Sequence, residues 1–139
     1  MEQRVSLITL AVADVDASKR FYLDGLGWSP YLDAPGEVVM IQVGQHLVLS
    51  LWDAGHFEDE VGSRMRGDGV PPITLAHNVS SNEEVDEILS LAAKIGADPV
   101  MPAQEREWGG YSGYFADPDG YRWEIAHAPG ELGDLVVPT

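Results

Sequence analysis

The sequence contains no cysteine, few basic residues and no long apolar run. Without cysteine, disulfide bonds, thiolate metal ligands and cysteine nucleophiles are all excluded. Eight lysines and arginines stand against 23 acidic residues, and the net charge of −15 disfavours sequence-independent binding to nucleic acid phosphates. No apolar stretch is long enough to span a membrane, and residues 1–5 lack the features of a signal peptide. A small cytoplasmic protein is the expected class.

What the chain does contain is typical of a folded globular protein. Its 139 residues are 45% apolar and 22% charged, which suits one domain or two small modules that share a core. The acidic surface favours solubility, and it would also favour a cationic ligand.

A short internal repeat divides the chain. The segment Ile-Thr-Leu-Ala occurs at 8–11 and again at 73–76. Each copy opens a predicted strand that is followed by a predicted helix. This pattern indicates duplication of one supersecondary unit. We therefore expect module one at 4–52, a linker at 53–71 and module two at 72–130.

Apolar periodicity and turn residues predict the same element order in both modules. In module one we expect a helix at 17–23 and strands at 5–12, 28–32, 38–43 and 47–52. In module two, Ser81 and Glu84 have capping-box spacing at the start of a helix that ends at Gly96. The strands expected there are 73–79, 98–101, 111–116 and 121–126.

Two segments are left outside these modules. The linker holds many glycines, prolines and charges, and one helical turn is compatible with it. Its length makes it a candidate flap over a pocket, although a plain connector is the simpler interpretation. The tail at 129–139 is expected to be a loop or a terminal extension.

The predicted order is β-α-β-β-β, twice, and it indicates an α+β fold. Each module would have a sheet with a helix on one face. Joining the modules would form a curved mixed sheet with a central cleft, the kind of junction at which ligands often bind.

Motifs at both ends of the chain resemble one superfamily. They are Leu10-x-Val12-x-Asp14 with the later Phe21-Tyr22, and the run from Gly113 to Glu124 that contains Asp-Pro-Asp-Gly. They resemble the vicinal oxygen chelate superfamily, which includes glyoxalase I, extradiol dioxygenases, methylmalonyl-CoA epimerase and bleomycin resistance proteins. The resemblance covers roughly residues 4 to 130. It implies the fold described above, often completed by pairing of two chains as a homodimer.

The resemblance also implies four ligand positions for a divalent metal. They fall at Leu7, Ser50, Thr74 (or Pro72) and Glu124. Only Glu124 has a side chain of the expected type, and one carboxylate does not hold a divalent ion against water. We therefore expect no metal and no cofactor, as in the bleomycin resistance proteins.

Strand alternation identifies further candidate ligand-binding residues. The side chains that share a face with the ligand positions are Thr9, Thr74, Asn78, Arg122 and Glu124. Arg122 and Glu124 lie two residues apart and could form an ion pair. Alternatively, Glu124 could accept a cation of the ligand or act as a general base.

Three aromatic residues are candidates for a stacking wall around a flat or cationic ligand. They are Trp52, Trp108 and Tyr111, with ordinary packing as the alternative. Trp123 falls on the helix-facing side of its strand and is expected in the core. By the same alternation, His77 and His127 lie away from the ligand positions.

These observations favour a metal-independent binding protein for a small organic molecule, cationic or aromatic, such as an antibiotic or toxic metabolite. The alternative is a lyase, isomerase or dioxygenase of the glyoxalase type. It would need an atypical metal site, or Glu124 as its acid–base group.

Overall fold

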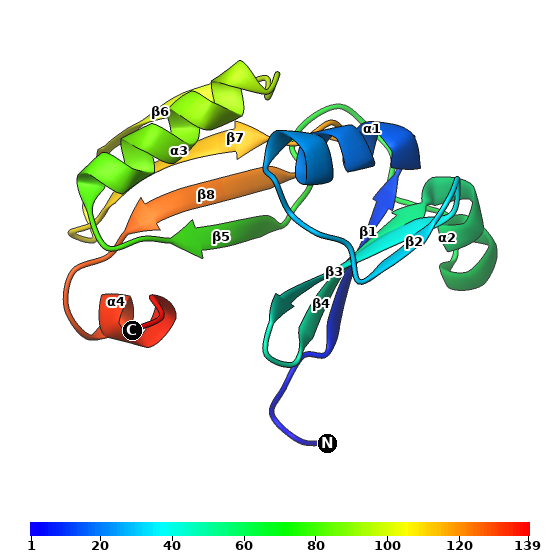
Figure 1. Ribbon diagram of the computed structural model, residues 1–139, viewed down its shortest axis with the longest axis horizontal. Coiled ribbons are helices and arrows are strands. Elements are labelled where there is room, and N and C mark those ends of the chain that lie inside the picture. The colour runs from blue at the N-terminus through cyan, green and yellow to red at the C-terminus, as the bar shows by residue number, and fades with distance from the viewer. The chain divides into compact units, whose positions relative to one another are not determined.

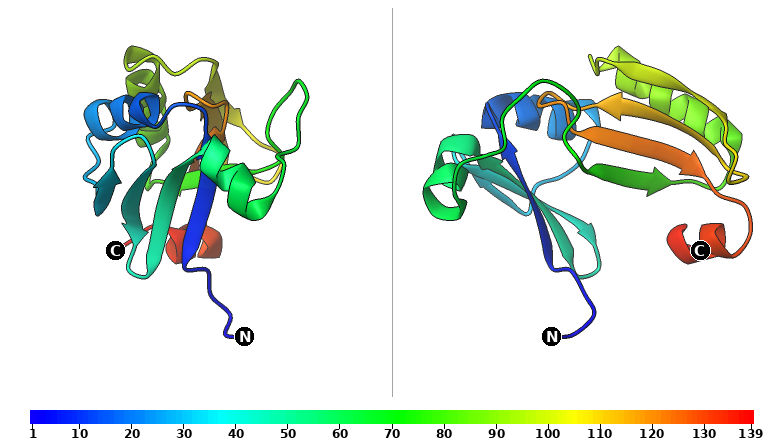
Figure 2. Two further views of the ribbon diagram at one scale, coloured as in Figure 1. Left: turned by 90° about the vertical axis from the view of Figure 1, so that its right-hand side faces the viewer. Right: turned by 180° about the vertical axis from the view of Figure 1, so that it is seen from behind.

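A computed structural model describes residues 1–139 as two compact units, Met1–Asp68 and Gly69–Thr139. We call them module one and module two. Their boundary falls inside the linker predicted at 53–71. Each unit contains its own four-stranded sheet with helical cover (Figure 1 and Figure 2).

Module one has the strand order β1-β4-β3-β2. The β1 strand (Leu7–Val12) runs parallel to β4 (Leu47–Asp53). The β3 strand (Val38–Gly44) is antiparallel to both β4 and β2 (Leu32–Ala34). Together with the helix after β1, this confirms the predicted β-α-β-β-β order.

The helix of module one is longer than predicted. Helix α1 (Val15–Lys19) begins where the Asp14 side chain accepts hydrogen bonds from the backbone N–H groups of Asp16 and Ala17. It continues into the π-helical segment η1 (Arg20–Gly25), where the N–H of Leu26 donates to the carbonyl of Phe21. The predicted start at residue 17 was therefore too late.

The core of module one lies between this helix and the sheet. Leu10, Val12 and Leu51 are buried on the helix-facing side of β1 and β4, as alternation predicts. Phe21 and Tyr22 complete the core, and their ring centroids lie 5.2 Å apart in an edge-to-face contact. Burial of each such side chain stabilises the fold by about 1.5–3 kcal/mol.

Two predictions for module one were wrong in position or extent. The strand expected at 28–32 starts only at Leu32, as β2. Trp28 is not part of it, because its ring packs on Tyr22 with centroids 5.6 Å apart and its backbone N–H donates to the Tyr22 carbonyl. The linker holds helix α2 (Ala54–Val61), which is more than one turn. Asp53 caps that helix by accepting from the His56 N–H.

Module two repeats the same topology, with strand order β5-β8-β7-β6. The β5 strand (Thr74–Asn78) runs parallel to β8 (Arg122–His127), while β7 (Tyr111–Ala116) is antiparallel to β8 and β6 (Val100–Glu105). The β6 strand starts and ends later than the predicted 98–101. The tail, predicted as a loop or a terminal extension, contains helix α4 (Glu131–Val136).

Helix α3 (Asn82–Lys94) covers one face of the second sheet (Figure 1). Its predicted cap is confirmed, because the Ser81 hydroxyl accepts from the Glu84 N–H at 3.2 Å. The side chains that α3 buries against the sheet are those of Val85, Leu89 and Ala92. Trp123 is buried on this side and stacks on Phe115 at 6.3 Å, which confirms its predicted place in the core.

A tight turn joins β7 to β8 and fixes their register. The Asp117 carboxylate accepts from the N–H groups of Asp119 and Tyr121, and Gly120 has a φ of +85° that favours glycine. The predicted turn is confirmed. It sets Tyr114 opposite Glu124 in the ladder.

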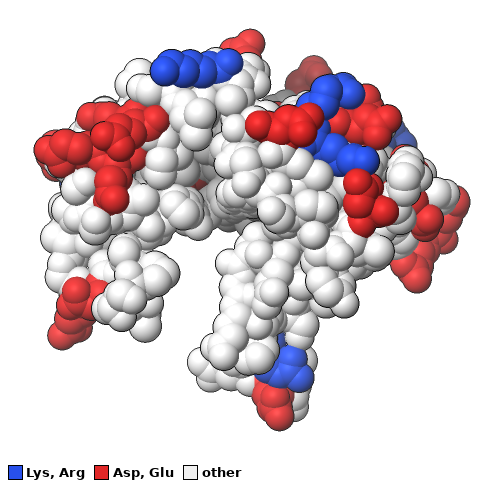
Figure 3. Space-filling view, viewed as in Figure 1, with Lys and Arg blue, Asp and Glu red and all other residues white.

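Acidic side chains dominate the charged surface, as the composition requires (Figure 3). None of the helices is both long enough and apolar enough to cross a membrane.

Candidate functional site

The sheet face opposite α3 carries most of the predicted site residues of module two. We call it the far face. Its direction is set by Gly113, where a Cβ would point at Leu89 of α3, so the neighbouring Ser112 and Tyr114 point the other way. In register with them on β8 and β5 are the remaining polar members of the face, Arg122, Glu124, Thr74 and Asn78.

Arg106 places a guanidinium group on the far face from the loop after β6. The loop is closed by a hydrogen bond from the Arg106 N–H to the Gly110 carbonyl at 2.8 Å. The guanidinium donates from Nε to the Ser112 hydroxyl at 3.0 Å and from Nη2 to the Ser112 carbonyl at 2.9 Å. It also lies over the Tyr114 ring, 5.8 Å from the centroid. Two fixed hydrogen bonds and one ring contact therefore hold this cation in place.

Tyr114 and Glu124 are direct cross-strand neighbours on the far face. Burial raises the pKa of the Tyr114 phenol, and the negative charge of Glu124 raises it further, while Arg106 opposes the shift. A hydrogen bond with the Glu124 carboxylate acts in the same direction as the burial. Tyr114 therefore keeps its proton at neutral pH and can donate it in a hydrogen bond.

The ion pair considered between Arg122 and Glu124 does not form. The Arg122 guanidinium instead donates from Nη1 to the carbonyl of Gly120 at 3.0 Å, in the turn before β8. Arg122 thus folds back toward the turn that precedes its own strand. Glu124 is left facing Tyr114, with the methyl group of Ala76 on its other side.

The residues at the implied ligand positions do not fit a divalent metal. In module two, Glu124 has Ala76 and Tyr114 as its neighbours, a methyl group and a protonated phenol. Leu7, in module one, has no donor atom. No three histidine, aspartate or glutamate side chains lie close enough to hold a metal ion.

In module one, the structure brings Thr9, Ser50 and Trp52 together on the sheet face away from α1. Thr9 pairs with Ser50 in the parallel ladder, and Trp52 is the next residue on that side of β4. The Trp52 ring contacts Phe57 of α2 edge to face, with centroids 6.0 Å apart. Trp52 is thus partly engaged in packing.

Trp108 and Tyr111 do not lie with the far-face residues. The Trp108 ring lies against Gly110 of its own loop and is 52% exposed. The Tyr111 hydroxyl donates to Asp86 of α3 at 2.8 Å, which places it on the helix side of β7. Within module two, these two aromatic side chains do not form a wall beside Glu124.

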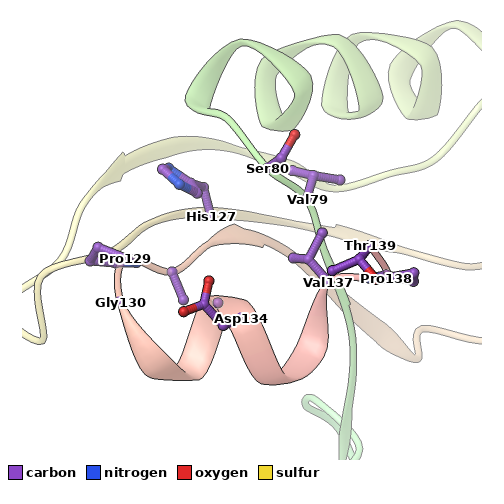
Figure 4. Close-up of a pocket in the computed structure, with 11 residues that line it drawn as sticks. Val79, Ser80, His127, Pro129, Gly130, Asp134, Val137, Pro138 and Thr139 are labelled. Atoms are coloured by element: carbon purple, nitrogen blue, oxygen red, sulfur yellow. The ribbon is translucent and has the colours of Figure 1, made fainter.

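A separate pocket of about 380 Å³ lies beside α4 (Figure 4). Asp134 projects into it from α4, whereas the His127 ring points away and its Nδ1 lies 2.9 Å from the Asn82 side-chain oxygen. His127 is therefore on the helix side, as predicted. None of the predicted site residues lines this pocket.

The fold and the far face define a duplicated β-α-β-β-β protein with a polar sheet face. Residues 4–125 match the family model of the Glyoxalase/Bleomycin resistance protein/Dioxygenase superfamily. The chain belongs to this superfamily, which confirms the resemblance seen in its sequence.

Solved structures agree with this assignment. A glyoxalase-related enzyme from Fulvimarina pelagi is 37% identical, with a TM-score of 0.82 over 92% of this chain and 90% of that chain. A lactoylglutathione lyase from Agrobacterium tumefaciens is 25% identical, with a TM-score of 0.71 over 95% and 97% of the two chains. A glyoxalase/bleomycin resistance protein/dioxygenase from Nocardioides is also 25% identical, with a TM-score of 0.77 over 96% and 91%. No curated protein matches the chain.

Sequence reasoning missed three residues of the far face: Arg106, Ser112 and Tyr114. Alternation from Glu124 across the Asp117–Gly120 turn could have identified Tyr114 and Ser112. Arg106 had no such signal, because its position depends on how the loop after β6 folds back.

Proposed function

We propose that the protein binds a small organic molecule on the far face of module two without a metal ion. The observation that carries this proposal is the surroundings of Glu124. Its strand neighbours are Tyr114, which is a protonated phenol, and Ala76, which offers no donor atom. Such a set recognises a ligand by hydrogen bonds and charge rather than by coordination.

Each polar group of the face has a role in this binding. Glu124 accepts hydrogen bonds from the ligand, Tyr114 donates one, and the Arg106 guanidinium adds a fixed positive charge. Thr74 and Asn78 on β5 add smaller hydrogen-bonding groups. In its most specific form, the proposal is that the protein sequesters an antibiotic or toxic metabolite. We further propose that it does so as a homodimer, as the family resemblance implies.

The test has a metal arm and a ligand arm. We expect purified protein to contain less than stoichiometric divalent metal, and chelator treatment to leave its melting temperature unchanged. A thermal-shift screen with metabolites and antibiotics should then find compounds that raise the melting temperature, since a ligand of the native state stabilises it by mass action. Glu124→Ala should weaken that shift. A tightly bound stoichiometric metal would refute the proposal.

A second candidate is metal-free acid–base catalysis by the same face. It is favoured by Tyr114 and Glu124, a protonated phenol and a carboxylate side by side, which could give and take a proton on one substrate. Glu124→Gln separates the two functions. An enzyme would lose turnover while still binding substrate, whereas a binding protein would show only weaker binding.

A further inference from the structure

Most of the few basic side chains of this acidic protein form ion pairs with carboxylates, but some do not. Of the eight, five form ion pairs with carboxylates. They are Arg4, Lys19, Arg20, Arg64 and Arg66. The remaining three are Lys94, Arg106 and Arg122.

Lys94 is exposed in the last turn of α3, where water and the helix dipole stabilise a cation. Arg106 and Arg122 are half-buried, and their guanidinium hydrogen bonds all go to neutral oxygens. Both belong to the far face or its border. The two half-buried cations without a carboxylate partner thus lie with Glu124 in one module.

A half-buried cation that forms no ion pair with a carboxylate strengthens the binding of an anion that reaches it. The side chain of Arg106 is already held by Ser112 through Nε and Nη2, so little rotamer entropy remains to be lost. Nη1 makes no bond within the protein and is free to donate to a ligand. Arginine is suited to carboxylate and phosphate groups because its donors form a planar fork.

We propose that the ligand of the far face is a small organic anion whose carboxylate or phosphate group binds Arg106. This rests on the proposed function, since it assumes that the far face is the binding site. Tyr114 and Glu124 then contact the hydroxyl or other polar groups beside the anionic group. The net charge of −15 attracts cations to the protein as a whole. At the far face, the positive charge of Arg106 opposes this general preference and favours an anion.

The experiment compares four probes of similar shape on the intact protein. They are benzoate, phenyl phosphate, the neutral benzamide and the cationic benzylamine, each at millimolar concentration in low salt. Melting temperature and titration calorimetry report binding. We expect benzoate, phenyl phosphate or both to bind, and the stronger of the two identifies the preferred anion. Benzamide and benzylamine should bind at least about tenfold more weakly.

Two variants of equal charge locate the site. Arg106→Gln should weaken binding of the anion about 10- to 100-fold, whereas Lys94→Gln, with the same change in net charge, should not. Arg106→Lys keeps the charge and should give an intermediate value. If Arg106→Gln fails to fold, added sodium chloride tests the same point in the wild-type protein, where it should weaken anion binding and spare benzamide.

Several outcomes would overturn the inference. They are no binding of either anion, equal binding of benzamide or benzylamine, and loss of binding in Arg122→Gln but not in Arg106→Gln. Binding of neutral probes that depends on Glu124 would leave the proposed function standing while refuting the anion. A stoichiometric metal in the purified protein would instead refute the proposed function itself.

Discussion

A single methyl group added at Gly113 should strain the packing of β7 against α3 and β6 in module two. A Cβ built there would lie 2.5 Å from a methyl group of Leu89, 2.6 Å from the Met101 carbonyl oxygen and 2.8 Å from the Ala103 nitrogen. Two of these three atoms are backbone atoms of β6, so β6 or β7 would have to move. Such overpacking of a close-packed interior costs about 1–3 kcal/mol.

For Gly113→Ala, this cost corresponds to a melting temperature lower by roughly 3–12 °C. Circular dichroism during thermal unfolding measures it directly. The matched control is Gly110→Ala, where the three nearest atoms all belong to the Trp108 ring. That ring is half exposed and can rotate into solvent, so the control should lose less than about 3 °C.

The contrast between the two glycines tests the reasoning, because the Trp108 ring approaches Gly110 more closely than any atom approaches Gly113. If crowding distance alone decided the result, Gly110→Ala would be the less stable variant. Equal melting temperatures for Gly113→Ala and the wild type, within about a degree, would show that β6 yields without cost.

Further predictions concern the helix cap and the phenol of the far face. Ser81→Ala should lower the free energy of unfolding by about 1 kcal/mol in urea titrations, and an unchanged midpoint would contradict the capping role. Hydrogen bonding from the Ser80 hydroxyl lowers the pKa of Glu84, so the stability that this carboxylate contributes at neutral pH should be lost as the pH falls below 4.5. Glu84→Gln should remove that acid-dependent part of the unfolding curve. Glu124→Gln should bring the raised pKa of Tyr114 back toward 10.0, measured by near-ultraviolet titration with Tyr114→Phe as the blank. A titration unaffected by the substitution would refute the contact.

Regular elements could be predicted well because their signals are local. The strand ending at Val12, the cap at Ser81 and the turn at Asp117 each depend on residues within a few positions of one another. The duplicated order could also be predicted, because one copy of the repeated segment lies within β1 and the other leads into β5.

The errors fell where tertiary packing decides. Because Trp28 packs on Tyr22, β2 begins later in the chain than predicted. Packing of Phe57 on Trp52 stabilises a helix in a segment whose glycines had suggested irregular structure. The site residues likewise divide into those that local sequence predicts and those that depend on tertiary structure. Alternation placed Glu124 and Thr74 on one face, whereas the fold of one loop brought Arg106 there.

The paired positions in the two parallel ladders bear on how this protein can change. Counted from the repeated segment, Ala11 beside Trp52 and Ala76 beside Glu124 are the same rung in the two sheets. One module thus holds an indole where the other holds a carboxylate. Each ladder is complete within its own half of the chain, so a substitution at one rung leaves the hydrogen bonding of the other intact. Evolution, natural or directed, has two separately variable copies of one position with which to alter specificity.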